Sequence, residues 1–361
     1  MHKHIKPALK LAAMAAALFS GAAMAQSSVT LYGQADMFVG GVKNVGASNR
    51  AYVANSGGMQ TSYWGIKGTE DLGNGTKAIF DLNGFFRTDS GSSGRFNGDS
   101  MFSRNAFVGL QNDKLGTIKL GRNTTPFFVS TILFNPLIDS YVFSPMVFHT
   151  YFGASTARVL DPGIIGDSGW NNSLLYSTPN FGGLTANVIY SFGEKAGATG
   201  QNKWGGNLMY FNGPFAATLA FQQVKFDSNP GDVTASTSPL LVGFSKQNAV
   251  QGGVSYDFKV VKLFAQGQYI KSDINNNVNG DIKHTNGQVG VSVPVGNGNI
   301  LASYAYDKTK NSVADFKRNT VAVAYDYNLS KRTDVYAAYF YDKITDLSHG
   351  DTFGVGLRHK F

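Results

Sequence analysis

Apolar and polar residues alternate with a period of two along most of this chain. Near the start, the apolar set is Val29, Leu31, Ala35, Met37 and Val39. The set that alternates with it is Thr30, Tyr32, Gln34 and Asp36. The same pattern recurs over residues 77–87, 320–329 and 332–342, and again in the ending TFGVGLRHKF. A period of two places alternate side chains on opposite faces of a β-strand. The pattern therefore predicts amphipathic strands throughout residues 26–361.

The predicted strands and their connections have the dimensions of a membrane barrel. Each strand has about ten residues, the length that a tilted strand needs to cross a bilayer. Short turns fall at 70–75, 112–116, 212–214, 294–298 and 328–332, whereas longer polar links include 43–58, 227–246 and 272–283. Short periplasmic turns and long extracellular loops are typical of outer-membrane barrels. We expect an all-β, transmembrane antiparallel barrel of about sixteen strands.

A soluble β-sandwich is the main alternative, because a sandwich also buries one face of each strand. Aromatic residues near the ends of the predicted strands argue for the barrel, and they include Tyr325, Tyr327, Tyr339 and Tyr341. Rings at these places are typical of the aromatic girdles at membrane interfaces. Closure of the barrel also pairs every backbone group of the strands.

Residues 1–25 have the features of an export signal. Three lysines precede the apolar run 11–19, and Ala23, Met24 and Ala25 match the small-residue pattern cut by signal peptidase. The run is too short to span ~30 Å of hydrocarbon. We predict cleavage before Gln26, which leaves residues 26–361 as the barrel domain.

Composition and charge argue against several classes of function. The formal net charge is +8, the positive residues are scattered, and the chain has no cysteine. Scattered charge argues against a nucleic-acid partner, and the lack of cysteine excludes disulfides and thiolate metal sites. The histidines after residue 25 lie in different segments, without a nucleophile, zinc or phosphate-loop motif. We therefore expect neither an enzyme nor a cofactor.

One long segment, residues 124–170, breaks the alternation. Asp139 is its only charged side chain between Pro126 and Ala157. The same stretch carries eight aromatic residues, which are Phe127, Phe128, Phe134, Tyr141, Phe143, Phe148, Tyr151 and Phe152. So apolar a segment is expected to fold inward against the barrel wall. Its rings would then either fix the loop to the wall or project into the lumen and favour aromatic solutes.

Several motifs, in order along residues 26–361, resemble the trimeric general porins of beta-proteobacterial outer membranes, which are related to the neisserial porins. They are SSVTLYGQAD, WGIKGTEDLGNGTKAIFDL, FSRNAFVGLQNDKLGTIKLGR, NNSLLYSTPNFGGLTANVIYSFGE, NLSKRTDVYAAY and GVGLRHKF. The resemblance implies a homotrimer of sixteen-stranded barrels, with the third long loop folded into the lumen. It also implies passive diffusion of small hydrophilic solutes and ions, with a weak preference for anions. The alternative is a substrate-selective channel for aromatic or organic acid solutes.

The resemblance assigns pore positions to Arg104 and Arg122. At two other positions where relatives often have arginine, this chain has Tyr63 and the Gly169–Trp170 pair. Many relatives have glutamate at the position of Asn83. These departures put a strongly charged constriction in doubt.

Strand parity adds further lumen candidates. Lys77, Asp81, Asn83 and Arg87 share the polar face of one predicted strand. Asp139 and Arg158, in the apolar segment, complete the set of candidates. Arg104 is ambiguous, because it shares parity with Ala106, Val108 and Leu110. Either that strand packs against the constriction loop, or a bulge shifts its register.

The ending TFGVGLRHKF is predicted to pair with the strand that contains TLYGQAD and so to close the barrel. In the family that the chain resembles, a terminal phenylalanine is the recognition mark for the barrel-assembly machinery, which assigns that role to Phe361. The other expected partners are outer-membrane lipid and lipopolysaccharide. We expect the protein to reside in the outer membrane.

Overall fold

The fold is taken from a computed structural model that describes residues 28–156, 159–194, 196, 202–225, 244–274 and 280–361. Three sequence-based expectations fall outside these residues. They are the export segment 1–25, most of the polar link 227–246, and the candidate pore residue Arg158.

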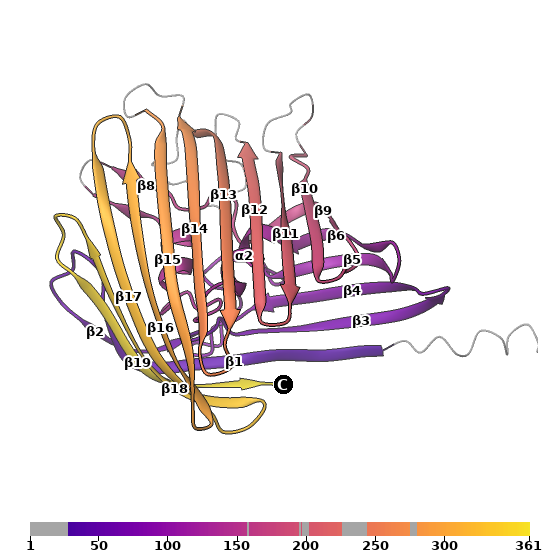
Figure 1. Ribbon diagram of the computed structural model, residues 1–361, viewed down its shortest axis with the longest axis horizontal. Coiled ribbons are helices and arrows are strands. Elements are labelled where there is room, and N and C mark those ends of the chain that lie inside the picture. Colours follow the sequence, from indigo (N-terminus) through magenta and orange to yellow (C-terminus); the bar gives the residue numbers. More distant parts are fainter. Residues whose placement is uncertain (1–27, 157–158, 195, 197–201, 226–243, 275–279) are drawn as a thin grey trace, which may run out of the picture.

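Within the described residues, seventeen antiparallel strands form one sheet that closes on itself (Figure 1). The strands are β1 (Ser28–Lys43), β2 (Ala51–Ser56), β3 (Tyr63–Gly73), β4 (Thr76–Phe85), β5 (Asn105–Asn112), β6 (Gly116–Thr124), β9 (Gly169–Ser177), β10 (Leu184–Ser191), β11 (Lys203–Asn212), β12 (Phe215–Lys225), β13 (Phe244–Asp257), β14 (Lys262–Ile274), β15 (Ile282–Val295), β16 (Gly298–Lys310), β17 (Asp315–Asn328), β18 (Thr333–Ile344) and β19 (Gly350–Lys360). Strands β2 and β3 lie beside different halves of β1, at residues 37–42 and 28–34 respectively. They share one position in the ring, so the barrel has sixteen positions, and the predicted fold is confirmed.

The first and last strands close the barrel. Residues 34–43 of β1 pair with residues 351–360 of β19 in an antiparallel ladder. Beyond the last pair, the backbone amide of Phe361 donates to the carbonyl of Gly33 at 3.0 Å, and the Gly33 amide donates back at 3.1 Å. The predicted pairing of the two ends is confirmed, and it leaves no unpaired sheet edge in the lipid.

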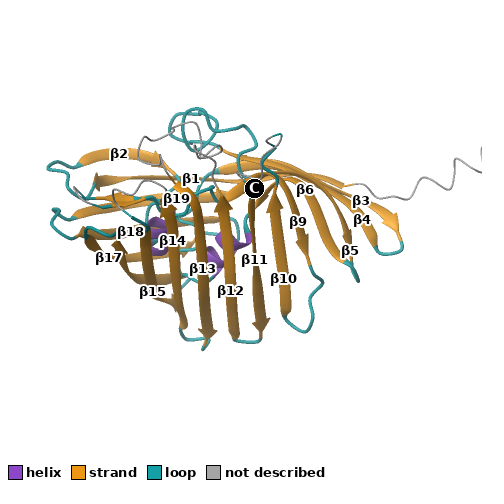
Figure 2. Ribbon diagram, turned by 90° about the horizontal axis from the view of Figure 1, so that it is seen from above, coloured by secondary structure: helices purple, strands orange, loops and turns teal. Residues whose placement is uncertain are grey.

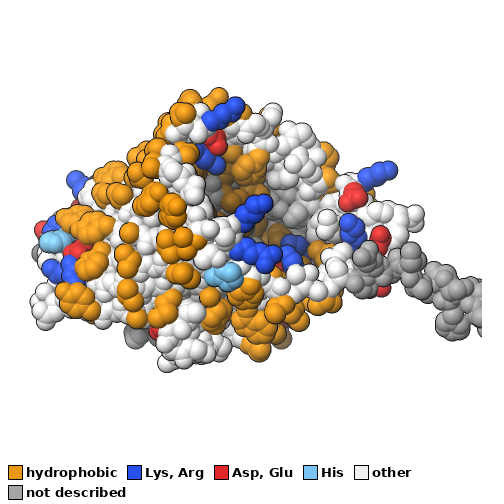
Figure 3. Space-filling model, turned by 90° about the horizontal axis from the view of Figure 1, so that it is seen from below, with side chains coloured by type: hydrophobic (Ala, Val, Ile, Leu, Met, Phe, Trp, Pro, Cys, Tyr) orange, Lys and Arg blue, Asp and Glu red, His pale blue; other side chains and the backbone are white. Residues whose placement is uncertain are grey.

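The alternation along each strand sorts side chains between the two faces of the barrel wall. Phe353, Val355 and Leu357 of β19 are exposed on the outside, whereas Arg358 is buried on the inside. Hydrophobic side chains cover much of the outer wall in Figure 3. The outer residues remain apolar because they face hydrocarbon rather than water.

Long and short connections lie at opposite ends of the barrel. Short turns join β3 to β4, β5 to β6, β11 to β12 and β15 to β16. The first three long connections are 44–62, which includes the short strand β2, 86–104 and 125–168. Two later connections at the same end, 311–314 and 345–349, are short. The long–short alternation therefore weakens towards the end of the chain.

The third long connection, residues 125–168, is here called the constriction loop, and it lies inside the ring of strands (Figure 2). It contains the helices α2 (Pro126–Leu133) and α3 (Pro145–Tyr151) and the short pair β7 (Ala154–Ser155) and β8 (Leu160–Asp161). Both helices begin with proline after a hydroxyl residue. Thr125 accepts a hydrogen bond from the Phe128 amide, and Ser144 accepts one from the Val147 amide. Neither these nor any other helix among the described residues is long and apolar enough to span a membrane.

Candidate pore constriction

Buried aromatic side chains fix the constriction loop to the barrel wall. Phe127, Phe134 and Phe143 are each at most 1% exposed. The Phe143 ring packs edge-on against Phe38 of β1, with centroids 5.6 Å apart. Leu137 and Phe143 pack in one cluster with wall residues, and Phe127 packs in another. Each such ring contributes about 1.5–3 kcal/mol through burial. For these residues, the aromatic content of the loop serves attachment.

Polar side chains of the wall hold the same loop. The Thr131 hydroxyl donates to Oε1 of Gln251, and the Thr150 hydroxyl donates to Oε1 of Gln268, both at 2.8 Å. Nδ2 of Asn207 donates to the Pro126 carbonyl, also at 2.8 Å. The loop thereby satisfies inward-facing amide groups that its own presence removes from water.

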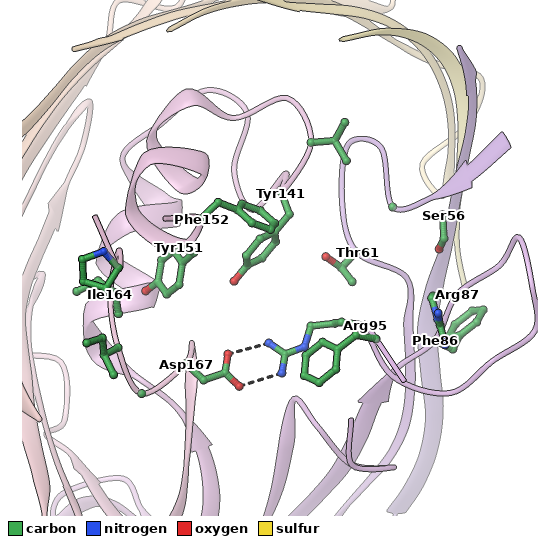
Figure 4. Close-up of a pocket in the computed structure, with 16 residues that line it drawn as sticks. Ser56, Thr61, Phe86, Arg87, Arg95, Tyr141, Tyr151, Phe152, Ile164 and Asp167 are labelled. Carbon is green, nitrogen blue, oxygen red and sulfur yellow. Dashed lines mark hydrogen bonds and ion pairs between the residues drawn. The ribbon is translucent and has the colours of Figure 1, made fainter. Parts of the chain in front are cut away.

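Other aromatic residues of the loop face open space. Tyr141, Tyr151 and Phe152 line a cavity of about 570 Å³ between the first three long loops. Tyr141 contacts Tyr151 at 6.0 Å and Phe152 at 5.7 Å between ring centroids, both in edge-on geometry. In Figure 4 these three rings lie across the cavity from Thr61, Phe86 and Arg87. The loop therefore has two kinds of aromatic residue. One kind fixes it to the wall, and the other faces the open cavity.

Positive charge gathers on the wall formed by β3, β4, β5 and β6. The Arg104 guanidinium lies over the Tyr63 ring, 4.3 Å from its centroid. Lys67 lies over Tyr32 and Lys119 over Phe107, each at 4.6 Å. An aromatic face holds a cation through its quadrupole and leaves the net charge in place. Among the described residues, none of these three cations has a carboxylate within ion-pair distance.

Arg104 faces inward because it stands outside the alternation that made it ambiguous. Strand β5 begins one residue later, at Asn105. Val108 and Leu110 of that strand are 60% and 49% exposed on the outer face. The Arg104 side chain instead reaches Tyr63, whose ring is 6.0 Å from that of Tyr32. A bulge in β5 is therefore not required.

Asp81 is the carboxylate of this wall. It accepts hydrogen bonds from the Tyr32 hydroxyl at 2.6 Å and from Nδ2 of Asn83 at 2.9 Å. Asn83 is fully buried, and its Oδ1 accepts from the Asn105 amide at 3.1 Å. Asn83 is uncharged, and its hydrogen bonds fix the positions of Asp81 and of the start of β5. Lys77 lies further along β4, is half-buried, and pairs across the sheet with Asp71 and Gln111.

Arg122 belongs to an ion-pair network rather than to the open wall. Its Nη2 is 2.8 Å from Asp167, its Nε donates to the Ser103 carbonyl at 2.6 Å, and its Nη1 donates to Asn171 at 2.7 Å. The register of β6 against β9 shifts between Gly121 and Asn123, and Gly121 has a φ of 131°. A side chain at Gly121 would meet the Ala106 carbonyl, so the bulge requires glycine.

Asp167 joins Arg122 to Arg95. The Arg95 guanidinium binds both oxygens of Asp167, at 2.7 and 2.9 Å (Figure 4). Its Nε also lies 2.9 Å from Asp99. Burial alone would raise the pKa of Asp167, but hydrogen bonds and charge from Arg95, with the charge of Arg122, hold that pKa well below its usual range. Arg95 is therefore neutralised, whereas the side-chain partner of Arg87 among the described residues is the neutral Asn97, at 2.7 Å.

A turn of the first long loop holds the tip of the constriction loop. Asp36 accepts hydrogen bonds from the backbone amides of residues 58, 59 and 60 and from the Tyr336 hydroxyl, at 2.6–3.0 Å. Gln60 then donates to Asp139 at 2.6 Å and accepts from Arg358 at 2.8 Å. Ser140 donates to the Gly58 carbonyl at 2.7 Å. We name residues 57–60 the clamp segment.

A histidine joins the far end of the constriction loop to the wall. Nδ1 of His284 lies 2.7 Å from Asp161, and its Nε2 lies 3.2 Å from Asp307. These side chains are the set among the described residues whose atoms lie close enough for a metal ion. Because each ring nitrogen faces a different carboxylate, the geometry suits a doubly protonated imidazole that bridges two acids.

Further inward arginines also form ion pairs, Arg318 with Asp342 and Arg358 with Asp334.

The structure thus separates these predicted site residues into four groups. Arg104, Asp81, Asn83 and Tyr63 lie on the basic wall, Arg87 lines the cavity between the long loops, Asp139 lies at the clamp segment, and Arg122 lies in the Asp167 network. Sequence reasoning missed Lys67, Lys119, Arg95, Asp167 and Gln60. Parity would have found the two lysines, whereas the others become significant only through contacts between loops. In Figure 3, Lys and Arg side chains border a hollow in the molecule.

A closed barrel with polar inner side chains, a folded-in loop and a basic wall defines an outer-membrane channel. The comparisons agree. A family model described as Gram-negative porin matches residues 12–347. Outer membrane porin protein 32 of Delftia acidovorans is 34% identical, over 97% of this chain and 92% of its own length. The major outer membrane protein P.IB of Neisseria meningitidis serogroup B is 27% identical, over 94% of this chain and 98% of its own length.

A solved structure described as an anion-selective porin from Comamonas acidovorans has a TM-score of 0.75 and 30% identity, and covers 93% of this chain and 100% of its own. The chain belongs to the Gram-negative porin family. It is an outer-membrane porin, and the family and the fold point to a channel rather than to an enzyme.

Proposed function

We propose that this porin is a passive, water-filled channel with a weak preference for anions. The observation that carries the proposal is the basic wall, where Lys67, Arg104 and Lys119 rest on aromatic rings and have no carboxylate partner among the described residues. Asp81 is an acid of that wall, and it accepts a hydrogen bond from the Tyr32 hydroxyl. A pore selects by its width and by the charges on its surface.

The paired charges explain why the preference is weak. Arg95, Arg122, Arg318 and Arg358 each face a carboxylate, so they add little net field. Asp139 adds a further carboxylate at the clamp segment. The relative described as an anion-selective porin supports the same direction of selectivity.

Reversal potentials in asymmetric potassium chloride test the proposal. The purified protein in a planar bilayer should be more permeable to chloride than to potassium. Arg104→Gln should lower the chloride-to-potassium permeability ratio by about twofold, because it removes a charge that no acid neutralises. Arg332→Gln, in the turn between β17 and β18, is the matched control and should leave the ratio unchanged. Equal ratios for the wild type and Arg104→Gln would contradict the proposal.

The assembly and export that accompany this function are part of the same proposal. We infer that residues 1–25 are removed on export, that three copies of 26–361 associate in the outer membrane among lipid and lipopolysaccharide, and that the barrel-assembly machinery recognises Phe361. The apolar outer face supports the membrane setting. Mass spectrometry of the mature N-terminus and the mass of the detergent-solubilised complex test the first two points.

A further inference from the structure

In the cavity between the first three long loops, aromatic rings and a positive charge lie on opposite sides of an open space, whereas in the basic wall each cation lies directly on a ring. Its 16 lining residues include the aromatic residues Phe86, Phe96, Tyr141, Tyr151 and Phe152. Its charged lining residues are Arg87, Arg95 and Asp167. Since Asp167 binds Arg95, the cavity retains the charge of Arg87.

The rings are held in position before any solute arrives. Phe128, which is 8% exposed, stacks on Tyr141 at 6.2 Å and meets Tyr151 edge-on at 5.2 Å. Phe152 contacts Tyr141 and Phe148, and Phe148 packs on Phe340 of the wall at 5.1 Å. A flat solute therefore meets an ordered aromatic surface, and little side-chain entropy remains to be lost on binding.

Arg87 supplies an anion site on the opposite side. Its Nη2 donates to Asn97 at 2.7 Å, and its Nε is a buried donor without a partner among the described residues. A donor of this kind is costly unless it is satisfied by water or a ligand. A carboxylate suits a guanidinium because the two groups form parallel, charge-assisted hydrogen bonds.

We propose that this cavity binds monocyclic aromatic carboxylates, with the ring against Tyr141 and Phe152 and the carboxylate towards Arg87. The cavity of about 570 Å³ lies in the range of small-molecule sites, so a single-ring acid fits with accompanying water. The inference rests on the proposed function, because it assigns a preferred solute class to the same anion-conducting channel. Binding must remain weak for transport, since a solute that enters must also leave.

The test compares three probes on single channels in planar bilayers. Benzoate carries a ring and a charge, cyclohexanecarboxylate carries the charge on a saturated ring of similar size, and benzyl alcohol carries the ring without the charge. We expect benzoate to interrupt the chloride current at millimolar concentration. The other two probes should be at least fivefold weaker.

Variants assign the effect to the cavity. Phe152→Leu should weaken benzoate at least threefold and leave cyclohexanecarboxylate unchanged, whereas Arg87→Gln should weaken both acids. Phe192→Leu, at an exposed phenylalanine outside the cavity, and Arg332→Gln are the matched controls. Equal affinity for benzoate and cyclohexanecarboxylate, or a benzoate affinity unaffected by both cavity variants, would overturn the inference. A channel that conducts chloride without such discrimination refutes the inference alone, whereas loss of anion preference in potassium chloride refutes the proposed function.

Discussion

At the residue scale, the partner of each cation decides what its charge does in this channel. Arg104, Lys67 and Lys119 lie on aromatic rings. A cation–π contact is worth roughly 0.5–2 kcal/mol and leaves the positive charge available to the lumen. Arg95 and Arg122 form ion pairs with Asp167, whose negative charge cancels part of their positive charge. Tyr63 therefore contributes to the basic wall by holding the Arg104 guanidinium in place.

Asp167→Asn should increase the preference for anions. The substitution keeps the side-chain size but leaves Arg95 and Arg122 without the carboxylate that they share. We expect the chloride-to-potassium permeability ratio to rise by about twofold. Asp113→Asn, in the short turn between β5 and β6, is the matched control. An unchanged ratio would show that the network does not contribute to the field in the lumen.

The effect of Asp167→Asn on the reversal potential should also have a defined dependence on pH. Arg95 and Arg122 hold the pKa of Asp167 below the ordinary value of 3.8. A depressed pKa stabilises the folded state above the unfolded value, and that contribution is lost only as the pH falls through the folded value. Asp167 therefore remains ionised at pH 4. The difference in reversal potential between wild type and Asp167→Asn should persist from pH 7 to pH 4, and its disappearance near pH 5 would contradict the network.

At the scale of elements, the constriction loop is held at three places. The two helices bury rings against the wall, His284 lies between Asp161 of the loop and Asp307 of the wall, and the clamp segment holds the tip. The clamp segment depends on Asp36, which is 1% exposed and gathers three backbone amides. Hydrogen bonds to a charged group contribute about 1.5–3 kcal/mol each.

Asp36→Asn should loosen the tip of the constriction loop without unfolding the barrel. Asparagine offers one acceptor oxygen in place of two, so part of the clamp segment loses its partner. We expect more frequent subconductance states and closure at lower voltage in single-channel recordings. Asp81→Asn, on β4 and without a contact to the clamp segment among the described residues, tests whether loss of any inward carboxylate has this effect. Current traces as steady as those of the wild type would contradict the role of Asp36, as would equal noise in the control.

At the scale of the whole molecule, the last residue completes the ring. Phe361 exchanges two backbone hydrogen bonds with Gly33, and its side chain, 44% exposed, packs against the same glycine. A barrel has no edge only if its terminal strands pair along their length. The backbone of Phe361 thus contributes to closure, while part of its ring remains exposed.

Two variants separate closure from recognition. Phe361→Ala keeps both backbone bonds, so refolding into lipid vesicles in vitro should match the wild type, while the amount assembled in cells should fall at least fivefold. Deletion of Phe361 should also lower the temperature at which the folded band is lost in gel electrophoresis. Phe353→Ala, on the outer face of β19, is the control. Normal assembly of Phe361→Ala in cells would contradict a recognition role for the ring.

The sequence by itself determined the barrel, its closure and the inward loop. A period of two sorts residues such as Val355 and Arg358 between lipid and lumen before any strand pairs, because the solvent on each face is fixed by the bilayer. The local start signals of α2 and α3, Thr125–Pro126 and Ser144–Pro145, are also legible in the sequence.

Only the tertiary structure decided which charges act in the pore. Arg104 and Arg122 look alike in sequence, but one lies on Tyr63 and the other on Asp167, 45 residues further along the chain. The same holds for the clamp, in which Asp36 and Arg358 act through Gln60 on Asp139. Charge effects depend on distance and burial in three dimensions, and periodicity along a strand carries no information about contacts between loops.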